Sequence, residues 1–312
     1  MTAIQAIVAY AIAAGMFVFP AVTAITIMRY GPVIGFATLG LVTALAVGVM
    51  GPAGGLSLIL GFGGLGVALW HWGRRPIRLE LYFAGLVSAF VVGTLGVQVV
   101  ALLAARIDPV DVALDAYRQV GAAFDAYVQL LRDNTGTDSL AYLNGLVAAR
   151  HTWVWTFFSL IPALLAAGAT ALTMLNFLLV RRVTPALWGL ALNRWRAPDH
   201  AIWAVLAAGL GLLPKFLGPM TGRVWAPAEP LFFIALNVAL IALLPYVLQG
   251  LAVIAFFLER WRLPRFLRAL TYFLLLTQGL LAAVAVLGLM EFWVDLRGRA
   301  MRPKDQDTTE RE

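Results

Sequence analysis

Uncharged polar side chains stand within the long apolar runs of this 312-residue chain. Nothing in hydrocarbon can satisfy such groups except the protein, a bound ligand or a water-filled cavity. Two of them, Tyr246 and Gln249, are three residues apart, so they share one face of a helix. We predict a pocket for a small molecule, whose identity the sequence does not give. Its expected ligand-binding residues are Tyr246, Gln249, Asn176, Thr173 and Gln278.

The pair lies beside Pro245 in a charge-free run over residues 230–258. Proline has no N–H, so the carbonyl of Ile241 loses its helical partner there. A kinked span with polar groups can form a binding site at mid-depth in a membrane. The alternative stays open that Pro245 is only a tolerated kink and that the polar side chains hold helices together.

The carboxylates nearest the membrane, among them Glu291 and Asp295, lie at the ends of the apolar runs. Glu291, Asp295 and Arg299 are spaced by four residues, which predicts local pairing on one helical face. A second interpretation gives Glu291, Asp295 and Arg297 a role in partner docking or coupling.

Several kinds of chemistry have no sequence basis. The chain has no cysteine, no P-loop, no H-E-x-x-H and no G-x-S-x-G, and its three histidines are far apart. The run 61–66 matches G-x-G-x-x-G, but it lies in an apolar stretch without the βαβ context of a dinucleotide site. We therefore predict no catalytic residue, no metal site and no cofactor, so the chain is not expected to be an enzyme. Any ATP-driven role needs a partner.

The amino-acid composition predicts the kind of helices that position these residues. The chain is 62% hydrophobic and 12% charged, whereas soluble domains have about 25% charged residues. An all-α, polytopic integral membrane protein is predicted. The net charge of +7 comes from arginines at the ends of spans, which indicates contact with lipid headgroups rather than with nucleic acid.

About eight transmembrane helices fit the apolar runs, four of them before residue 107 and four after residue 150. Gly51-Pro52 marks the turn between the second and third spans, and Pro162 a kink in the fifth. An uncleaved first span is favoured over a signal peptide, because no basic region precedes it. The expected spans are 3–28, 32–50, 55–72, 81–105, 152–180, 201–219, 230–258 and 266–290.

The parts between and beyond these spans complete the predicted organisation. Asp108 and Pro109 predict the start of an amphipathic extramembrane helix within 107–150. Residues 185–196 predict an interfacial helix. The predicted regions are 1–106, 107–150, 151–299 and a charged tail, 300–312. The span 201–219 either crosses or is re-entrant, and the arginine distribution favours termini outside the cell only weakly.

Three motifs in the C-terminal half carry a family resemblance: Leu175-Asn176-Phe177 to Arg181-Arg182, Tyr246-Val247-Leu248-Gln249-Gly250, and Gly288 to Asp295-Leu296-Arg297. They resemble the YybS-like family of predicted bacterial membrane proteins, a domain of unknown function, over about residues 150–299. That family is grouped with the substrate-binding subunits of energy-coupling-factor transporters and with the rod-shape protein MreD.

The resemblance implies a multi-pass protein of the bacterial cytoplasmic (inner) membrane. It implies a small-molecule-binding transport component that borrows ATPase and coupling subunits. The alternative from the residues is a membrane scaffold or regulator that binds other envelope proteins through 107–150 and the arginine-rich loops.

Overall fold

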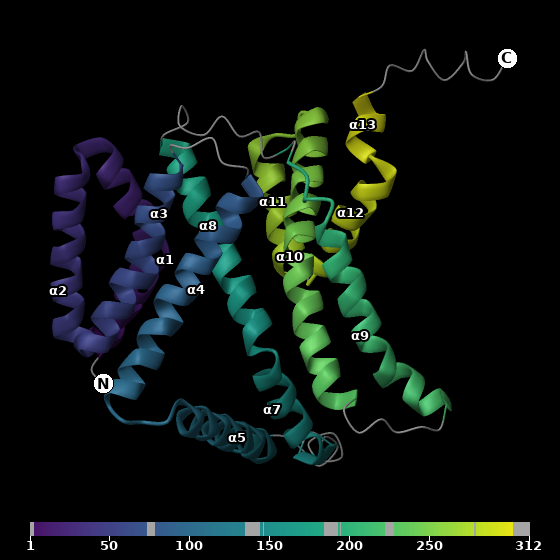
Figure 1. The fold of residues 1–312 in the computed structure, drawn as a ribbon, viewed down its shortest axis with the longest axis horizontal. Coiled ribbons are helices and arrows are strands. Elements are labelled where there is room, and N and C mark those ends of the chain that lie inside the picture. Colours follow the sequence, from purple (N-terminus) through teal and green to yellow (C-terminus); the bar gives the residue numbers. More distant parts are fainter. Residues whose placement is uncertain are drawn as a thin grey trace. The chain divides into compact units, whose positions relative to one another are not determined.

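The computed structural model describes residues 3–73, 79–134, 144–145, 147–183, 193, 195–221, 228–277 and 279–301. Over these ranges every regular element is a helix, which confirms the all-α prediction (Figure 1). The chain divides into two compact units. Unit 1 comprises residues 1–77 and 82–187, and unit 2 comprises residues 78–81 and 188–312. Each is described separately.

Unit 1 begins with two helices joined by a tight turn. Helix α1 (Ala3–Tyr30) is followed by α2 (Pro32–Ser57), and Gly31 between them has φ +88°. Gly51, with φ +77°, interrupts α2 next to Pro52. This break separates two candidate membrane spans, Pro32–Val49 and Gly51–Trp72. The predicted turn at Gly51-Pro52 is therefore confirmed.

Glycines allow the next helices to approach closely. The chain continues as a π-helix, η1 (Leu58–Gly63), then α3 (Gly64–Trp72) and α4 (Leu79–Ala104). A Cβ at Gly66 would collide with the Pro20 carbonyl, and one at Gly93 with the Leu60 carbonyl. The run 61–66 lies in η1 and α3, so these glycines serve helix packing, as expected for membrane helices.

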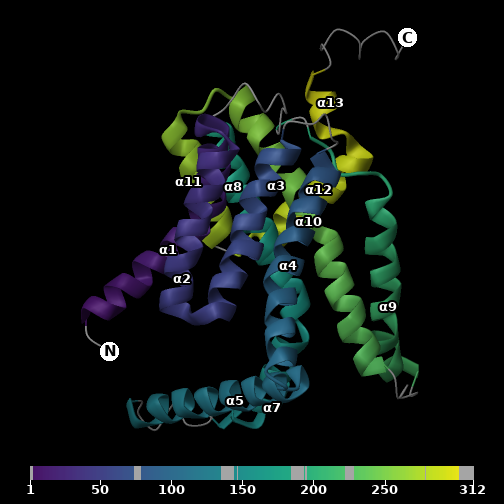
Figure 2. The same ribbon diagram turned by 60° about the vertical axis from the view of Figure 1, so that its left-hand side comes forward.

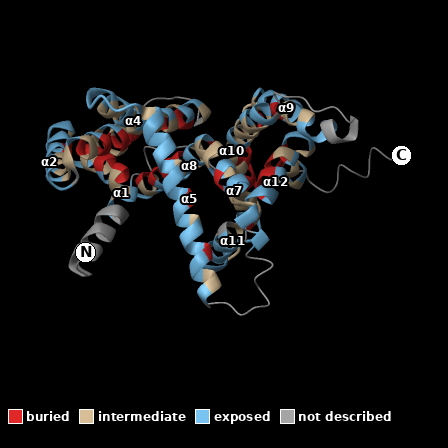
Figure 3. Cartoon of the chain, turned by 90° about the horizontal axis from the view of Figure 1, so that it is seen from below, coloured by how far each residue is buried: buried red, intermediate tan, exposed pale blue. Residues whose placement is uncertain are grey.

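The extramembrane segment of unit 1 contains α5 (Pro109–Asn134). Its start is capped as predicted, because the Asp108 carboxylate accepts a hydrogen bond from Val110 N at 2.8 Å. The helix is exposed along most of its length (Figure 3). The shorter helix expected to follow falls mostly outside the described residues.

The last span of unit 1 has two parts, α7 (Arg150–Ser159) and α8 (Ile161–Val183). The break at Leu160 confirms the kink predicted from Pro162. Helix α5 packs against α7 through a ring contact of Tyr117 with Phe158 and an ion pair of Asp125 with Arg150 at 3.0 Å.

Unit 2 contains an antiparallel pair, α9 (Ala201–Thr221) and α10 (Ala228–Arg260). Phe216 contacts Phe232, while the residues just before α9 reach Gln249. Helix α9 thus lies along α10 only from the start of α10 to about Gln249. The described residues just before α9 lie beside the remainder of α10. The described residues 195–198 are not helical; residues 185–192 and 194 of the predicted interfacial helix lie outside the described residues.

The predicted span 266–290 is not one helix. Helix α11 (Arg265–Thr277) and α12 (Leu281–Val294) are separated at Gly279, which has φ +65°. Figures 1 and 2 show them as the two arms of a hairpin. Asn193 contacts both Glu259, at the end of α10, and Arg297, just beyond α12. The hairpin therefore returns to the end of unit 2 from which it starts. The short α13 (Leu296–Met301) follows.

Five segments are long and apolar enough to cross a bilayer: Pro32–Val49, Gly51–Trp72, Glu80–Ala104, Ile161–Val183 and Glu229–Arg260. Three shorter apolar segments accompany them, Gly15–Tyr30, Ala201–Leu217 and Leu281–Val294. A multi-pass membrane architecture is the result. The predicted count of eight spans stays unconfirmed, because Leu281–Val294 is one arm of the hairpin.

Arginines lie at the ends of the apolar helices in both units. In unit 1, Arg29 is in the last turn of α1, and Arg181 and Arg182 are in that of α8. The part of unit 1 around α5 carries both signs, with arginines at 106, 118, 132 and 150 and aspartates at 108, 111, 115, 125 and 133. In unit 2, Arg260 ends α10 and Arg262 follows it, and Arg299 lies in α13, at the same end of the hairpin. Counted over short loops only, the positive-inside rule predicts that the ends with Arg29, with Arg181 and Arg182, and with Arg260 and Arg262 face the cytoplasm.

This topology can be tested by cysteine labelling, because the chain contains no cysteine. We expect Arg262→Cys and Met301→Cys to react with a membrane-impermeant maleimide only after cells are permeabilised. Gln119→Cys, on exposed α5, is expected to react in intact cells. Labelling of Arg262→Cys and Met301→Cys from opposite sides would contradict the hairpin, and full reversal of the pattern would contradict the orientation.

Candidate functional site

The candidate site of unit 2 is built around an unwound segment of backbone. Asn193 Nδ2 donates to Glu259 Oε2 at 2.6 Å, and Ala197 N donates to Gln249 Oε1 at 2.7 Å. Asn193 and the non-helical residues 195–197 therefore lie beside α10, between the levels of Glu259 and Gln249. Non-helical backbone at membrane depth is tolerated only where protein or a water-filled cavity satisfies it. Its partners are consequently the first feature to explain.

Gln249 supplies one of these partners. Its side chain is 2% exposed, and its Oε1 atom takes the Ala197 N–H, which no helix satisfies. Tyr246 lies one turn earlier and forms a buried cluster with Ala197 and Ile202. The two residues share a face, as predicted, and both face the unwound segment. Gln249 thus has a structural hydrogen bond in the absence of any ligand.

A buried ion pair supplies the other partners. Glu291 and Arg297 are 1% and 3% exposed, and Glu291 Oε1 accepts from Arg297 Nε at 2.7 Å. Arg297 Nη1 also donates to the carbonyls of Asn193 and Trp195, at 2.8 and 3.0 Å. Glu291 Oε2 accepts from Leu296 N at 2.9 Å. The pair therefore joins the end of the hairpin to the unwound segment.

The predicted local pairing at the end of α12 exists with different partners. Asp295 has φ +47° and ends the helix, so the four-residue spacing no longer places Arg299 beside the carboxylates. Glu291 pairs with Arg297 instead, and Asp295 pairs with Arg196 from the unwound segment. The face predicted from a continuous helix is wrong because the left-handed residue turns the chain.

Three buried donors in this region have no hydrogen-bond partner among the described residues: Tyr246 Oη, Trp195 Nε1 and Arg297 Nη2. Trp195 packs against the cluster that contains Tyr246, and its carbonyl binds Arg297, so the three groups belong to one neighbourhood. Tyr246 is completely buried. Buried polar groups are almost always satisfied, and an exception indicates a role, a water or a ligand. All three can donate to an acceptor atom.

Helices α10 and α12 meet backbone to backbone at this level. A Cβ at Gly250 would collide with the carbonyl of Val284, and one at Gly288 with the carbonyl of Tyr246. Only glycine permits this approach. It holds the backbone of Tyr246 against α12 and so places the residue in a fixed position.

Asn176, in unit 1, also forms hydrogen bonds with the protein through both its side-chain nitrogen and its side-chain oxygen. Its Nδ2 donates to Phe17 O and Leu172 O, and its Oδ1 accepts from Ala21 N, all at 2.8 Å. Phe17 O and Ala21 N are partners in a regular helix, so the amide is inserted into the ladder of α1 beside Pro20. Such insertion is a known cause of kinks.

The structure therefore divides the predicted ligand set. Tyr246 and Gln249 face one segment of unit 2, whereas Asn176 and Thr173 belong to unit 1. Thr173 is buried, and its Oγ1 has no partner among the described residues. Gln278 lies outside the described residues. No described group of three or more histidine, cysteine or acidic residues could hold a metal ion.

Sequence reasoning missed the contribution of residues 195–197. The predicted interfacial helix, 185–196, includes Trp195 and Arg196, because Trp195 and neighbouring apolar residues recur at helical spacing, and it ends before Ala197. Pro198 carried the contrary signal, since the residue before a proline is biased toward extended backbone.

Comparison with known proteins identifies a family. A family model described as a predicted membrane protein (DUF2232) matches residues 2–291. No curated protein and no solved structure matches the chain. The similarity to energy-coupling-factor subunits and to MreD stays a prediction.

Breaking the buried pair on one side should be costly. We expect Arg297→Met to lower the free energy of unfolding by about 3–5 kcal/mol, because Glu291 is left as an uncompensated buried charge. Glu291→Leu combined with Arg297→Met should cost less than Arg297→Met alone. Denaturant titration in detergent micelles measures both.

The matched control is Arg196→Met, which breaks the exposed pair with Asp295 and should cost at most about 1 kcal/mol. Equal effects of Arg196→Met and Arg297→Met would show that the buried pair has no special role.

Replacing Asn176 tests the insertion into α1. Asn176→Leu leaves Phe17 O and Ala21 N without the amide, and a cost of about 1–3 kcal/mol is expected for buried unsatisfied groups. Thr170→Val, which removes only a bond to Ala166 O within α8, should be nearly neutral. A neutral Asn176→Leu would mean that α1 closes its own ladder.

Proposed function

Because the chain belongs to the DUF2232 family of predicted membrane proteins, we propose that it is a small-molecule-binding component of a membrane transport system. Its place would be the bacterial cytoplasmic membrane. The binding site is in unit 2, where α10, the unwound residues 195–197 and the end of the hairpin meet. The proposed role is binding rather than catalysis.

The cluster of unpartnered donors supports this proposal most strongly. Tyr246 Oη, Trp195 Nε1 and Arg297 Nη2 are buried and lack partners among the described residues. A ligand with acceptor atoms would satisfy them. Gln249 and Glu291 are already engaged, so they hold the site in shape while the three donors remain for the ligand.

The backbone around the site is of a kind that transport proteins use. Their sites lie where helices are broken near the middle of the membrane, because unwound backbone there offers groups that a continuous helix keeps for itself. Here the break before α9 and the hairpin α11–α12 provide two such interruptions, and both contact α10. They favour binding over a purely structural bundle.

Energy would have to come from other subunits. The chain has no P-loop, so ATP hydrolysis, where it drives the transport, belongs to an ATPase acting through a coupling membrane protein. Such an ATPase would meet the arginine-rich ends, which are the ends we assign to the cytoplasm.

A scaffold or regulator is the second candidate, and one observation favours it. Helix α5 leaves apolar side chains exposed, among them Val110, Leu114 and Tyr127. A partner protein could cover them, as could the membrane surface. Removal of residues 107–150 should then release that partner.

The transport proposal is tested by purifying the tagged protein from its native membranes in mild detergent. Mass spectrometry should identify ATPase and coupling subunits and a co-purified small molecule. We expect Tyr246→Phe to retain about tenfold less of that molecule, the effect of one lost hydrogen bond of about 1.4 kcal/mol. Proteins without an ATPase, released by deletion of 107–150, would favour the scaffold.

The matched control is Tyr127→Phe, which removes a hydroxyl from exposed α5 and should leave the bound molecule unchanged. Circular dichroism of both variants checks the fold. Retention of the molecule by Tyr246→Phe at the wild-type level would contradict the proposed site.

A further inference from the structure

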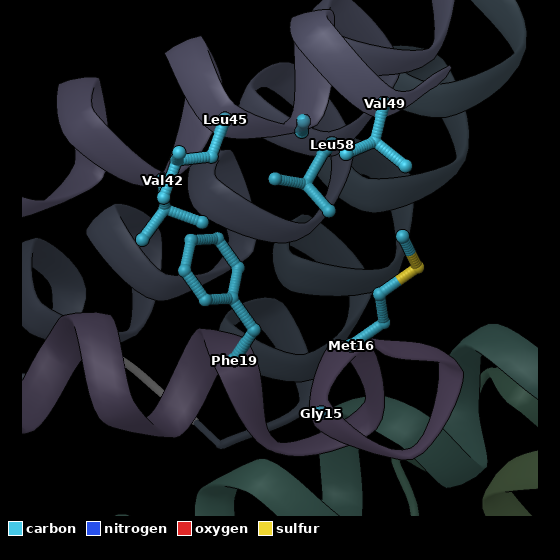
Figure 4. A pocket seen from close by; sticks show the side chains of 8 residues that line it. Gly15, Met16, Phe19, Val42, Leu45, Val49 and Leu58 are labelled. Carbon is cyan, nitrogen blue, oxygen red and sulfur yellow. The ribbon is translucent and has the colours of Figure 1, made fainter. Parts of the chain in front are cut away.

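Unit 1 contains an apolar cavity of about 380 Å³ between α1, α2 and the start of η1 (Figure 4). Its volume is in the range of small-ligand pockets, about 300–1,000 Å³. It is lined by Gly15, Met16, Phe19, Val42, Leu45, Ala46, Val49 and Leu58. No lining side chain can form a strong hydrogen bond, so the cavity shares no chemistry with the donor cluster of unit 2.

The sequence around the cavity places it in hydrocarbon. No residue between Arg29 and Arg74 is charged, and Pro32–Val49 is a candidate span. The lining residues of α2 lie in its last turns before Gly51, so the cavity is near one end of this span. Water would find no polar partner there, and apolar cavities of this kind stay dry.

The cavity is open toward the lipid. Leu45 and Val49 line the cavity, yet they are 63% and 72% exposed. They therefore form the rim of the cavity on α2, at the side that faces the bilayer. On the α1 side, Gly15 has no side chain to close the cavity, and a Cβ there would meet nothing within 4 Å. If the cavity were empty, its lining residues would lose dispersion contacts. A hydrocarbon chain of a surrounding lipid can restore those contacts.

We propose that this cavity binds one acyl chain of a membrane phospholipid. The chain enters between α1 and α2 at the level of Leu45 and packs against Phe19 and Leu58. The site is specific for hydrocarbon, since its walls offer nothing that recognises a headgroup. It is independent of the small-molecule site proposed for unit 2.

The experiment uses the full-length protein in vesicles of phosphatidylethanolamine and phosphatidylglycerol. These carry a trace of phospholipid with a diazirine in the middle of an acyl chain. After illumination, mass spectrometry compares adducts on the peptide containing Met16 with adducts at Val92, an exposed residue of α4. We expect Gly15→Leu, which fills the cavity, to remove the adducts at Met16 and to leave those at Val92 unchanged.

Gly48→Leu is the matched control: it makes the same change on α2, also in open space, but outside the cavity lining. It should leave the adducts at Met16 in place. If Gly15→Leu and Gly48→Leu label Met16 equally, the contact is ordinary lipid exposure and the proposal fails. Labelling of Val92 without any at Met16 in the wild type would equally overturn it, because another protein segment would then occupy the cavity.

Discussion

Hydrocarbon offers no hydrogen bonds, and this constraint explains the buried polar residues of both units. Where a helix is regular, its backbone satisfies itself. Where it is broken, a side chain takes over: Asn176 for Phe17 O and Ala21 N, Gln249 for Ala197 N, and Arg297 for the carbonyls of Asn193 and Trp195. The polar residues are therefore found where the helices deviate.

The hydrogen bonds of the buried side chains also separate two kinds of polar residue in the membrane segments. Asn176 uses its donors and acceptor within unit 1, and a residue so engaged has little left for a ligand. Tyr246 has a buried hydroxyl with no partner among the described residues. Burial alone does not distinguish the two. The remaining hydrogen-bonding capacity does: Thr173 in unit 1 has one such group, whereas the three donors of Tyr246, Trp195 and Arg297 belong to one neighbourhood in unit 2.

Local signals in the sequence predicted much of the architecture. Charge-free runs gave the membrane segments, Gly51-Pro52 gave the turn between two of them, and Asp108 gave the cap of α5, because each acts through its own neighbours. The hairpin was missed, since hydropathy does not distinguish one long span from two short arms joined at Gly279. The partners of Gln249 and Glu291 depended on folding: each bonds backbone or side chains that helical spacing does not place beside it.

Helix α12 ends at the same end of unit 2 at which α11 begins, and this has a consequence for how the unit is assembled. If 266–290 crossed the bundle as one straight span, α13 would lie at the opposite end of unit 2 from the turn after α10. As a hairpin, the two arms leave α13 at the same end as that turn, and α12 packs against α10 through Gly250 and Gly288. Arg297 then needs to leave water only when Glu291 and the unwound segment are in place to receive it. Packing of the hairpin against α10, rather than one further straight span, thus completes the surroundings of Glu291.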